Sequence, residues 1–449
     1  MIKRIGIGVL AVVIAAVLAF ALWWFRPWSP YSPAQITALD DPDAYPVTFQ
    51  RMDEILPSTP IEPGDPEPLP RAEASLPQTY VFDGETRDLE SYFERAEVTG
   101  VTVLRDGVIV EQAFFHGAGP DTRFTSWSVA KSVVASLVAM ALEEGRIESL
   151  EDPAEKYAPQ FAGTDYGATS LRHLLMMSAG MDFNEEYSPD APSDVRPLFF
   201  NAFIMGRDVD AMVGEIERDR TPGEDQHYTS PNSHVLAAVV RGIYGERLAE
   251  IVEAKIWTPL GMTGEASWLQ NVAGEDGIAI GYCCLQATSA DYARLGEFWR
   301  VGGVWEGERM LPEGFIPSWT APSRPFQEPG ATPYPGRGYA MHFWVPEGYD
   351  GEFYAAGVYG QYVWVDTRRG VVIAQNAGDE NWGEIALEAA AVFRAIAEHI
   401  SPLDARPEAE LDALREAVRA RPITAPEEDG APEPPSESDP EAGSEAPGR

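Results

Sequence analysis

The sequence RFTSWSVAKSVVASLVAMALEEGRI, residues 123–147, is typical of a buried apolar helix that begins near Ser126 and ends near Gly145. Its first turns contain Ser128 and Lys131, although the whole chain has lysine at only four positions. Residues three apart share one face of a helix, so this hydroxyl and this amine are neighbours. An amine buried against apolar side chains loses solvation, which lowers its pKa and lets it take the proton of a serine hydroxyl. The spacing therefore predicts a nucleophilic Ser128 with Lys131 as its base.

The alternative is a lysine that extends to solvent beside an unrelated serine, and a single Ser-x-x-Lys pattern does not exclude it. No Gly-x-Ser-x-Gly motif and no histidine motif offers a rival nucleophile. The six histidines show no His-Glu-x-x-His spacing, so we expect no metal, and nothing in the sequence implies another cofactor. Cys283 and Cys284 are adjacent, and we expect two small buried side chains there.

Charge limits the classes of partner. The net charge is −38 over 449 residues, and phosphate binding needs a basic surface, so nucleic acid is excluded as a partner. Solubility accounts for the acidic excess, and attraction of cationic substrates is the alternative.

Strand and helix signals alternate along the chain. Residues 99–117 form two β-rich runs around Asp106-Gly107, a strong hairpin signal, and residues 351–378 form another pair of strands with a turn at Arg369-Gly370. Residues 150–277 are expected to be mainly helical, and residues 382–400 form a helix. This order predicts an α+β fold in which late strands complete one antiparallel sheet begun by the early hairpin.

The two ends differ from the body in composition, which divides the chain. Residues 1–28 contain an uncharged run long enough to span about 30 Å of bilayer, preceded by Lys3 and Arg4. We expect a membrane anchor, with cleavage at Ala19-Phe20-Ala21 as the alternative, and an exported body in either case. Beyond it we expect a proline-rich arm, a main domain, a helical extension and an acidic unstructured tail, over residues 29–76, 77–400, 401–423 and 424–449.

Several ordered blocks identify a family resemblance. The 123–147 helix is followed by LEDPAEKYAPQF at 150–161, SLRHLLMMSAGMDF at 170–183, PGEDQHYTSPNSHVLAAVV at 222–240 and AAGVYGQYVWVD at 355–366. In this order they closely resemble the serine β-lactamase and penicillin-binding superfamily. The branch they resemble is that of class C β-lactamase-related hydrolases, which includes 6-aminohexanoate-dimer hydrolases and esterases. The resemblance covers about 77–400 and implies a β-lactamase/transpeptidase-like fold, an antiparallel sheet flanked by helices plus a mainly helical region.

The resemblance also implies site residues. Ser128 matches the acylated nucleophile, Lys131 its partner, and Tyr228 the tyrosine of the second motif. We further expect the charge of Lys131 to stabilise the phenolate of Tyr228 and make it a usable base. The N–H groups of Ser128 and Val358 match an oxyanion hole, and the matching substrate-binding residues are Ser230, Asn232, Gly357 and Gln361.

The third motif departs from the pattern of penicillin-recognising relatives. Where they have Lys-Thr-Gly or His-x-Gly, this chain has Ala355-Ala356-Gly357, which keeps the glycine but lacks the cation that holds a substrate carboxylate. We therefore expect an exported serine hydrolase of small esters, amides or peptides. A D,D-peptidase or β-lactamase is the first alternative, and a catalytically silent envelope protein is the second. The sequence leaves the oligomeric state open.

Overall fold

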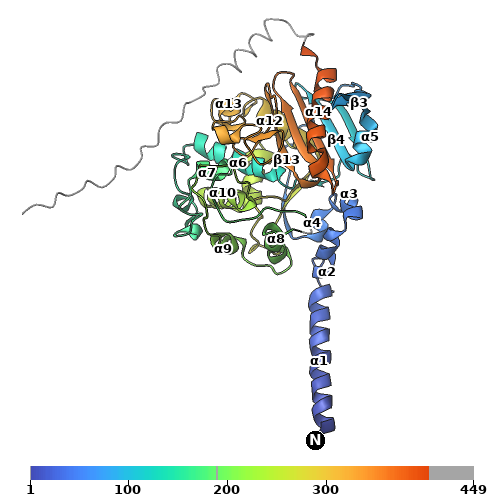
Figure 1. The fold of residues 1–449 in the computed structure, drawn as a ribbon, viewed down its shortest axis with the longest axis vertical. Coiled ribbons are helices and arrows are strands. Elements are labelled where there is room, and N and C mark those ends of the chain that lie inside the picture. Colours follow the sequence, from blue (N-terminus) through green and yellow to red (C-terminus); the bar gives the residue numbers. More distant parts are fainter. Residues whose placement is uncertain (1, 189–190, 404–449) are drawn as a thin grey trace, which may run out of the picture.

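The protein is described by a computed structural model that covers residues 2–188 and 191–403. Figure 1 shows a sheet with helices on both faces, a mainly helical region beside it, and one long helix that projects from the body. The predicted α+β class is confirmed. Of the predicted extension over 401–423, only residues 401–403 lie within the described residues, and the predicted tail over 424–449 lies outside them.

The main sheet has seven strands, and each strand is antiparallel to its neighbours. Their order is β11 (Arg337–Tyr339), β12 (Trp344–Pro346), β13 (Glu352–Gly357), β14 (Gln361–Asp366), β15 (Val371–Ala377), β4 (Val98–Arg105) and β5 (Val108–Phe114). The late strand β15 pairs with the early strand β4, so the predicted non-local completion of the sheet is confirmed. The β4–β5 turn has positive φ at Asp106 and Gly107, 47° and 78°, as a tight hairpin requires.

One difference from the sequence prediction concerns the late strands. Residues 351–366 were expected to be a single strand, but the short helical turn η7 (Val358–Gly360) divides them into β13 and β14. Gly357 pairs with Gln361 across this turn. The turn therefore lies at the end of the sheet, next to the residues predicted to bind substrate.

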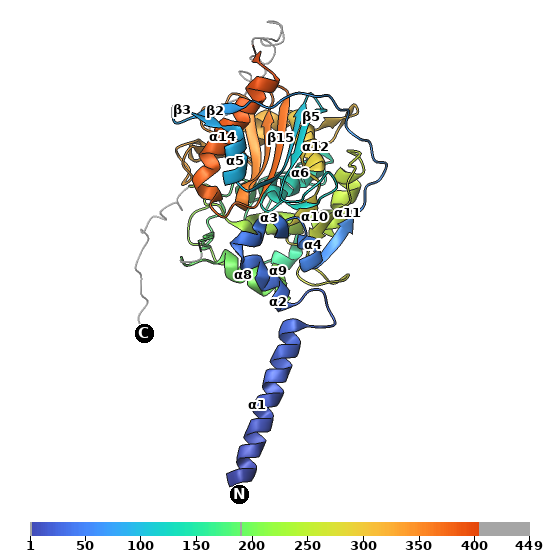
Figure 2. The ribbon, with the colours of Figure 1, turned by 90° about the vertical axis from the view of Figure 1, so that its right-hand side faces the viewer.

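Alternating side chains of the sheet enter two separate cores. On β14, Val363 and Val365 join one apolar cluster, whereas Tyr362 and Trp364 join the other, as the two-residue period of a strand requires. Helix α14 (Trp382–Ile400), in the predicted range, covers the second face, and α6 (Val129–Glu143) and α12 (Ser289–Arg300) cover the first. Figure 2 shows α5 (Leu89–Arg95) beside α14.

The region between β5 and α12 is mainly helical, as predicted, and contributes a second, smaller sheet. The helices are α7 (Leu171–Leu175), α8 (Val195–Phe203), α9 (Val209–Gly214), α10 (Ser230–Tyr244) and α11 (Leu248–Val252), with short turns η3 (Ala154–Lys156), η4 (Pro159–Phe161) and η5 (Glu253–Trp257). The second sheet has the order β1 (Ser58–Ile61), β7 (Ala266–Leu269), β8 (Leu285–Ala287) and β6 (Phe124–Thr125). This sheet was not predicted, because its strands are short and come from four distant segments.

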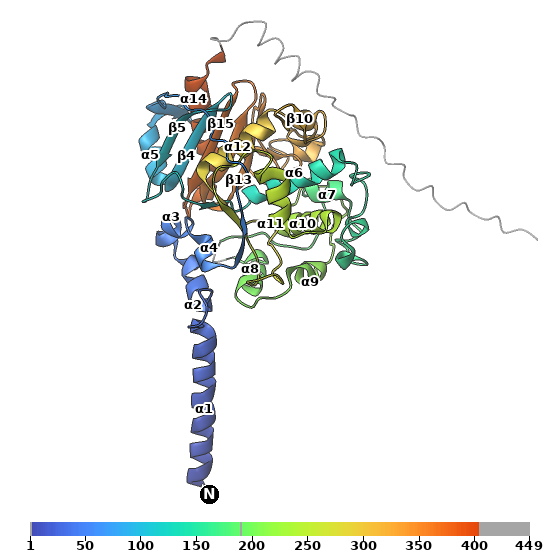
Figure 3. The same ribbon diagram turned by 180° about the vertical axis from the view of Figure 1, so that it is seen from behind.

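Small elements complete the body. They are the hairpin β2 (Thr79–Phe82) and β3 (Glu85–Asp88), the hairpin β9 (Val304–Trp305) and β10 (Glu308–Arg309), α13 (Phe315–Trp319) and η6 (Pro325–Gln327). Figure 3 places β10 on the part of the body away from the long helix α1.

The proline-rich arm is more regular than its composition suggested. It forms α2 (Pro33–Ile36), η1 (Thr37–Asp40), η2 (Pro42–Ala44), α3 (Tyr45–Thr48), α4 (Met52–Ile55) and strand β1. Pro33 and Pro42 occupy first helical positions, where a missing N–H costs nothing, and Pro60 lies in β1, an edge strand. Between residues 33 and 61 the proline-rich arm therefore forms mostly short helical elements and one strand, whereas residues 62–76 contain no helix or strand.

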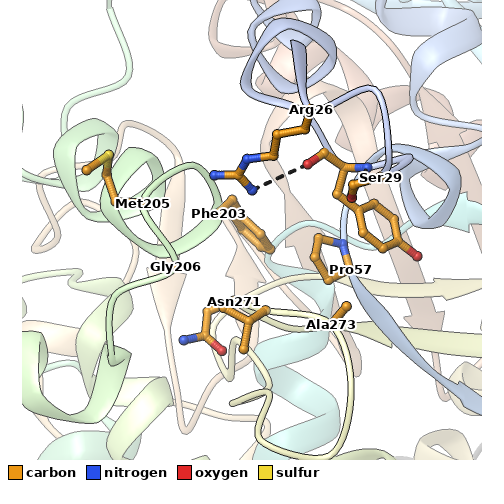
Figure 4. A pocket seen from close by; sticks show the side chains of 10 residues that line it. Arg26, Ser29, Pro57, Phe203, Met205, Gly206, Asn271 and Ala273 are labelled. Carbon is orange, nitrogen blue, oxygen red and sulfur yellow. Dashed lines mark hydrogen bonds between the residues drawn. The ribbon is translucent and has the colours of Figure 1, made fainter. Parts of the chain in front are cut away.

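Helix α1 (Ile2–Phe25) contains a 19-residue apolar segment, Ile7–Phe25, with a mean hydropathy of 2.6 and no side chains buried against the body. Where the arm leaves this helix, the Arg26 guanidinium donates to the carbonyl oxygens of Tyr31, at 3.5 Å, and Ile204, at 3.3 Å. A cavity of about 280 Å³ lies here, between Arg26, Phe203 and Asn271 (Figure 4). None of the predicted catalytic side chains lines it, so this cavity is separate from the candidate active site.

Candidate active site

Ser128 occupies the residue before the first turn of α6, and its hydroxyl is not used to cap the helix. Trp127, just before it, has a φ of 41°, a left-handed conformation that turns the chain into the helix. Ser126 fixes the chain just before Ser128, because its Oγ accepts hydrogen bonds from the N–H groups of Cys284 and Leu285 at 3.1 and 3.0 Å. The half-buried Ser128 hydroxyl is thus free to contact catalytic partners and substrate.

Lys131 lies one turn along α6 and is 1% exposed. Its Nζ lies 2.9 Å from Ser128 Oγ and donates to the Tyr282 carbonyl oxygen at 2.8 Å. Loss of solvation lowers the pKa of this amine to about 8, and the Glu185 carboxylate opposes this by raising it. The predicted buried amine beside the serine is therefore present, and a solvent-directed lysine is not what the structure shows.

The buried His342 lies behind this amine without adding positive charge. Its Nδ1 is 2.8 Å from the Leu175 carbonyl oxygen, which can only accept, so Nδ1 carries a proton and Nε2 accepts from Ser233 Oγ at 2.8 Å. Burial lowers the pKa of His342 to about 3. The neutral ring leaves Lys131 as the titrating base of this cluster near neutral pH.

Tyr228 lies two residues before the start of α10 and hydrogen-bonds to Ser128. The Lys131 Nζ lies 5.2 Å from the centre of its ring. The pKa of Tyr228 is nevertheless raised well above 10, because the side chain is buried and the Glu185 carboxylate is close. The expectation of a stabilised phenolate was wrong: Tyr228 is a neutral phenol, suited to donate and relay protons.

Glu185 was not predicted, and it is a central charge of the site. Its carboxylate accepts from the Ser230 N–H at 2.8 Å and from the hydroxyls of Ser230 and Tyr187, each at 2.5 Å. Because Ser230 begins α10, the carboxylate lies at the positive end of that helix. No motif in the loop around Glu185 marks it, and only the packed structure brings it near Lys131 and Tyr228.

The predicted oxyanion donors are brought together by Gly357. A Cβ atom on Gly357 would lie 2.9 Å from the backbone nitrogen of Ser128 and 2.6 Å from the Ser126 carbonyl oxygen. Only glycine allows the end of β13 to pack this closely against the start of α6. Within the described residues the Ser128 N–H donates to no protein acceptor, which leaves it available to a substrate oxygen.

The remaining predicted substrate-binding residues contact other protein groups in this structure. The Ser230 hydroxyl donates a hydrogen bond to Glu185. Asn232 is fully buried, and its amide nitrogen lies 3.5 Å from Met177 Sδ. Gln361 is 1% exposed, and its amide donates to the carbonyl oxygens of Tyr359 and Ala377 at 3.1 and 2.6 Å. Gln361 thus braces the turn after Gly357, and the substrate-binding role of Asn232 and Gln361 stays a prediction.

Aromatic rings surround Tyr228. Tyr228 stacks on Trp344 at 5.6 Å and meets the edges of Tyr339 and Tyr334 at 5.7 and 6.3 Å. These rings come from the β11–β12 region and exclude water from the phenol, which explains its raised pKa.

Cys283 and Cys284 follow Tyr282, whose carbonyl oxygen binds Lys131. Both are buried, as predicted, but their sulfur atoms form a disulfide, so the expectation of two separate apolar side chains was wrong. Within residues 2–188 and 191–403, no group of three or more His, Cys, Asp or Glu side chains is arranged to hold a metal ion.

Comparison with known proteins places this geometry in a family context. The model of the Beta-lactamase family matches residues 89–392, which is more than half of the chain. A curated 6-aminohexanoate-dimer hydrolase from Paenarthrobacter ureafaciens is 28% identical over 340 residues, covering 73% of this chain and 83% of that protein.

Solved structures share the fold at lower identity. A structure from Bacillus anthracis, assigned as a 6-aminohexanoate-dimer hydrolase, has a TM-score of 0.71 at 22% identity and covers 81% of this chain and 96% of its own. EstCE1, a hydrolase with promiscuous acyltransferase activity, has a TM-score of 0.54 at 17% identity and covers 69% and 96%.

Proposed function

Because the chain belongs to the beta-lactamase family and is a serine hydrolase, we propose that it cleaves ester or amide bonds through an acyl-enzyme on Ser128. The observation that carries this proposal is the 2.9 Å contact between Ser128 Oγ and the fully buried amine of Lys131, whose pKa is about 8. The proposed catalytic domain, residues 77–400, includes the whole family match.

In acylation, neutral Lys131 accepts the Ser128 hydroxyl proton while Oγ attacks the substrate carbonyl carbon. The N–H groups of Ser128 and Val358 stabilise the negative charge that develops on the carbonyl oxygen. The bond to the leaving group then breaks, and the departing amine or alcohol takes a proton from the Tyr228 hydroxyl. Lys131 returns the proton it had taken, through water, to the oxygen of Tyr228.

In deacylation, water attacks the ester carbon on Ser128, and the neutral amine of Lys131 accepts the water proton, which the Tyr228 phenol can relay. The carbon–oxygen bond to Ser128 breaks, the serine regains its proton, and the acid is released. The net reaction is acyl transfer to water, with both catalytic partners restored.

Substrate class is proposed from the charge beside the nucleophile. The strand Ala355-Ala356-Gly357 carries no cation, and Glu185 places a carboxylate near Lys131 and Tyr228. A substrate carboxylate next to the scissile bond would be repelled here, which disfavours penicillins and D-alanyl-D-alanine ends. The curated relative's name, 6-aminohexanoate-dimer hydrolase, supports a linear amide.

Location is proposed from α1. The apolar segment Ile7–Phe25 is long enough to cross a bilayer, and Lys3 with Arg4 before it would keep the N-terminus inside. We propose an exported protein whose catalytic domain lies outside the cytoplasmic membrane, held by α1 or released if α1 is cleaved.

The assignment of Ser128 predicts covalent labelling at one residue. A fluorophosphonate or an activated ester should add its acyl or phosphoryl group to the peptide containing Ser128, detected by mass spectrometry. Ser128→Ala should abolish this labelling, because the variant has no oxygen to attack. Unchanged labelling in Ser128→Ala would sink the assignment, and absence of labelling in the wild-type protein across a broad panel would indicate a silent protein.

A second prediction concerns pH. Only the neutral amine of Lys131 can accept the serine proton, so kcat/KM should rise with pH and level off above a pKa of about 8. The Glu185 carboxylate raises the pKa of Lys131, so Glu185→Gln should move the rising limb of the pH–rate profile to lower pH.

The measurement is a rate profile with a neutral ester between about pH 6 and 10, a span that brackets the lysine. Glu186→Gln is the matched control, because Glu186 is the next residue in the chain but its carboxylate is not a cause of the shifted Lys131 pKa. A limb that stays in place or moves to higher pH in Glu185→Gln would contradict the assignment of Lys131 as the titrating base.

A further inference from the structure

Four aromatic side chains, Tyr45, Phe49, Trp127 and Tyr359, form a cluster that joins the proline-rich arm to the catalytic domain. Phe49 contacts Trp127 at 5.3 Å and Tyr359 at 5.1 Å between ring centres. Tyr45 contacts Tyr359 at 4.8 Å, and Trp127 contacts Tyr359 at 5.4 Å. Two of these rings thus belong to the arm, and two belong to the segments that carry the proposed oxyanion donors.

Trp127 and Tyr359 are the chain neighbours of those donors. Trp127 immediately precedes Ser128, and Tyr359 immediately follows Val358. Both have left-handed backbones, with φ of 41° and 63°, which large aromatic residues rarely adopt. Such conformations persist only where surrounding contacts hold them, and here Phe49 packs against both rings.

The arm is also fixed to the same segments through its backbone. The Phe49 carbonyl oxygen accepts from the Thr125 N–H at 3.0 Å, three residues before the nucleophile. A Cβ on Gly378 would lie 2.4 Å from the Pro46 nitrogen, so α3 packs directly on the chain after β15. The next residue, Asp379, donates its N–H to the Tyr359 carbonyl oxygen at 3.2 Å. The arm therefore contacts both sides of the proposed oxyanion hole.

We propose that Phe49 and Tyr45 are positioning residues that hold the Ser128 and Val358 N–H groups in line with the substrate oxyanion. This inference rests on the proposed acyl-enzyme mechanism and adds to it a segment that precedes the family match, which begins at residue 89. The arm residues do not touch the substrate. They act through Trp127 and Tyr359, whose backbone conformations aim the two donors.

The arm keeps this role whether or not the N-terminal helix is removed. Cleavage after Ala21 would leave residues 22–76 attached, including α3, α4 and the Arg26 contacts with Tyr31 and Ile204. Figures 1 and 2 show α3 and α4 against the body at the base of the sheet, between α1 and the helices α6 and α10. The segment that follows α1 is therefore part of the proposed active site.

The test compares Phe49→Ala with the wild-type full-length protein on a neutral ester. Displacing a reacting group by about 1 Å can cost as much as about 10² in rate, so we expect kcat to fall by about 10-fold or more. KM should change little, because an interaction made only in the transition state lowers kcat and kcat/KM together. A boronic acid that forms a tetrahedral adduct on Ser128 should weaken in parallel with kcat/KM.

Leu56→Ala is the matched control for lost stability. Leu56 is also buried and follows helix α4 of the same arm, but it carries no ring in the cluster. It should lower the thermal midpoint and leave kcat unchanged. Tyr45→Phe, which keeps the ring, should retain kcat, whereas Tyr45→Ala should lose it.

Two results would overturn the inference. One is a folded Phe49→Ala protein whose kcat and boronate affinity are unchanged. The other is loss of kcat in Leu56→Ala as large as that in Phe49→Ala, which would make the arm a general stabiliser. Failure of Ser128 labelling in the wild-type protein would instead reject the proposed mechanism itself, so the two failures are distinguishable.

Discussion

Lys131→Arg should abolish acylation of Ser128 although the positive charge of the side chain survives. The structure places the amine 2.9 Å from Ser128 Oγ, with a pKa lowered to about 8 by burial. A guanidinium has a pKa above about 12 and cannot give up its proton to become a base. Loss of general-base catalysis costs on the order of 10²–10⁴ in rate, and we expect the acylation rate to fall at least that far.

The measurement is burst or single-turnover acylation by an activated ester, with folding checked by circular dichroism. Because Lys131 is 1% exposed, the larger arginine can also disturb packing, so Lys131→Met serves as a second variant. Methionine fills a similar volume without a titrating group, and it should lose acylation to the same extent. A folded arginine variant that acylates within about tenfold of the parent between about pH 6 and 9 would refute the base assignment.

Features set by neighbouring residues could be predicted from the sequence. The Asp106-Gly107 turn, the left-handed Gly145 after α6 and the whole of α14 depend on local spacing and on residues that tolerate positive φ. The Ser128–Lys131 contact belongs to the same class, because three residues along a helix always bring two side chains together.

Features that depend on packing between distant segments could not be predicted from the sequence. Glu185 reaches the start of α10 from a loop 45 residues earlier, and nothing in that loop indicates a catalytic neighbour. Burial is the main cause that raises the pKa of Tyr228, and the Glu185 carboxylate raises it further. Sequence pattern suggested the cation of Lys131, whereas burial and the Glu185 carboxylate determine the result.

Gly357→Ala should impair the same reaction for a steric reason. Its φ is −125°, which any residue can adopt, so the glycine is required by space and not by backbone conformation. An added Cβ would lie 2.6 Å from the Ser126 carbonyl oxygen and 2.9 Å from the Ser128 nitrogen, and both are backbone atoms that cannot rotate away. The end of β13 must then move from α6, which separates the Val358 and Ser128 donors. Loss of one oxyanion donor costs roughly 10²–10³ in kcat, and we expect a loss of that size.

Gly338→Ala separates this effect from general strain in the sheet. Its Cβ would lie 2.4 Å from the Gln327 carbonyl oxygen, a comparable backbone clash, but on strand β11, which carries neither proposed oxyanion donor. Both variants should lose thermal stability, and only Gly357→Ala should lose acylation per folded molecule. Gly383→Ala, where a Cβ meets nothing within 4 Å, should leave both properties unchanged. If Gly338→Ala and Gly357→Ala lost acylation equally, the close approach at Gly357 would be a requirement of the sheet and not of the oxyanion hole.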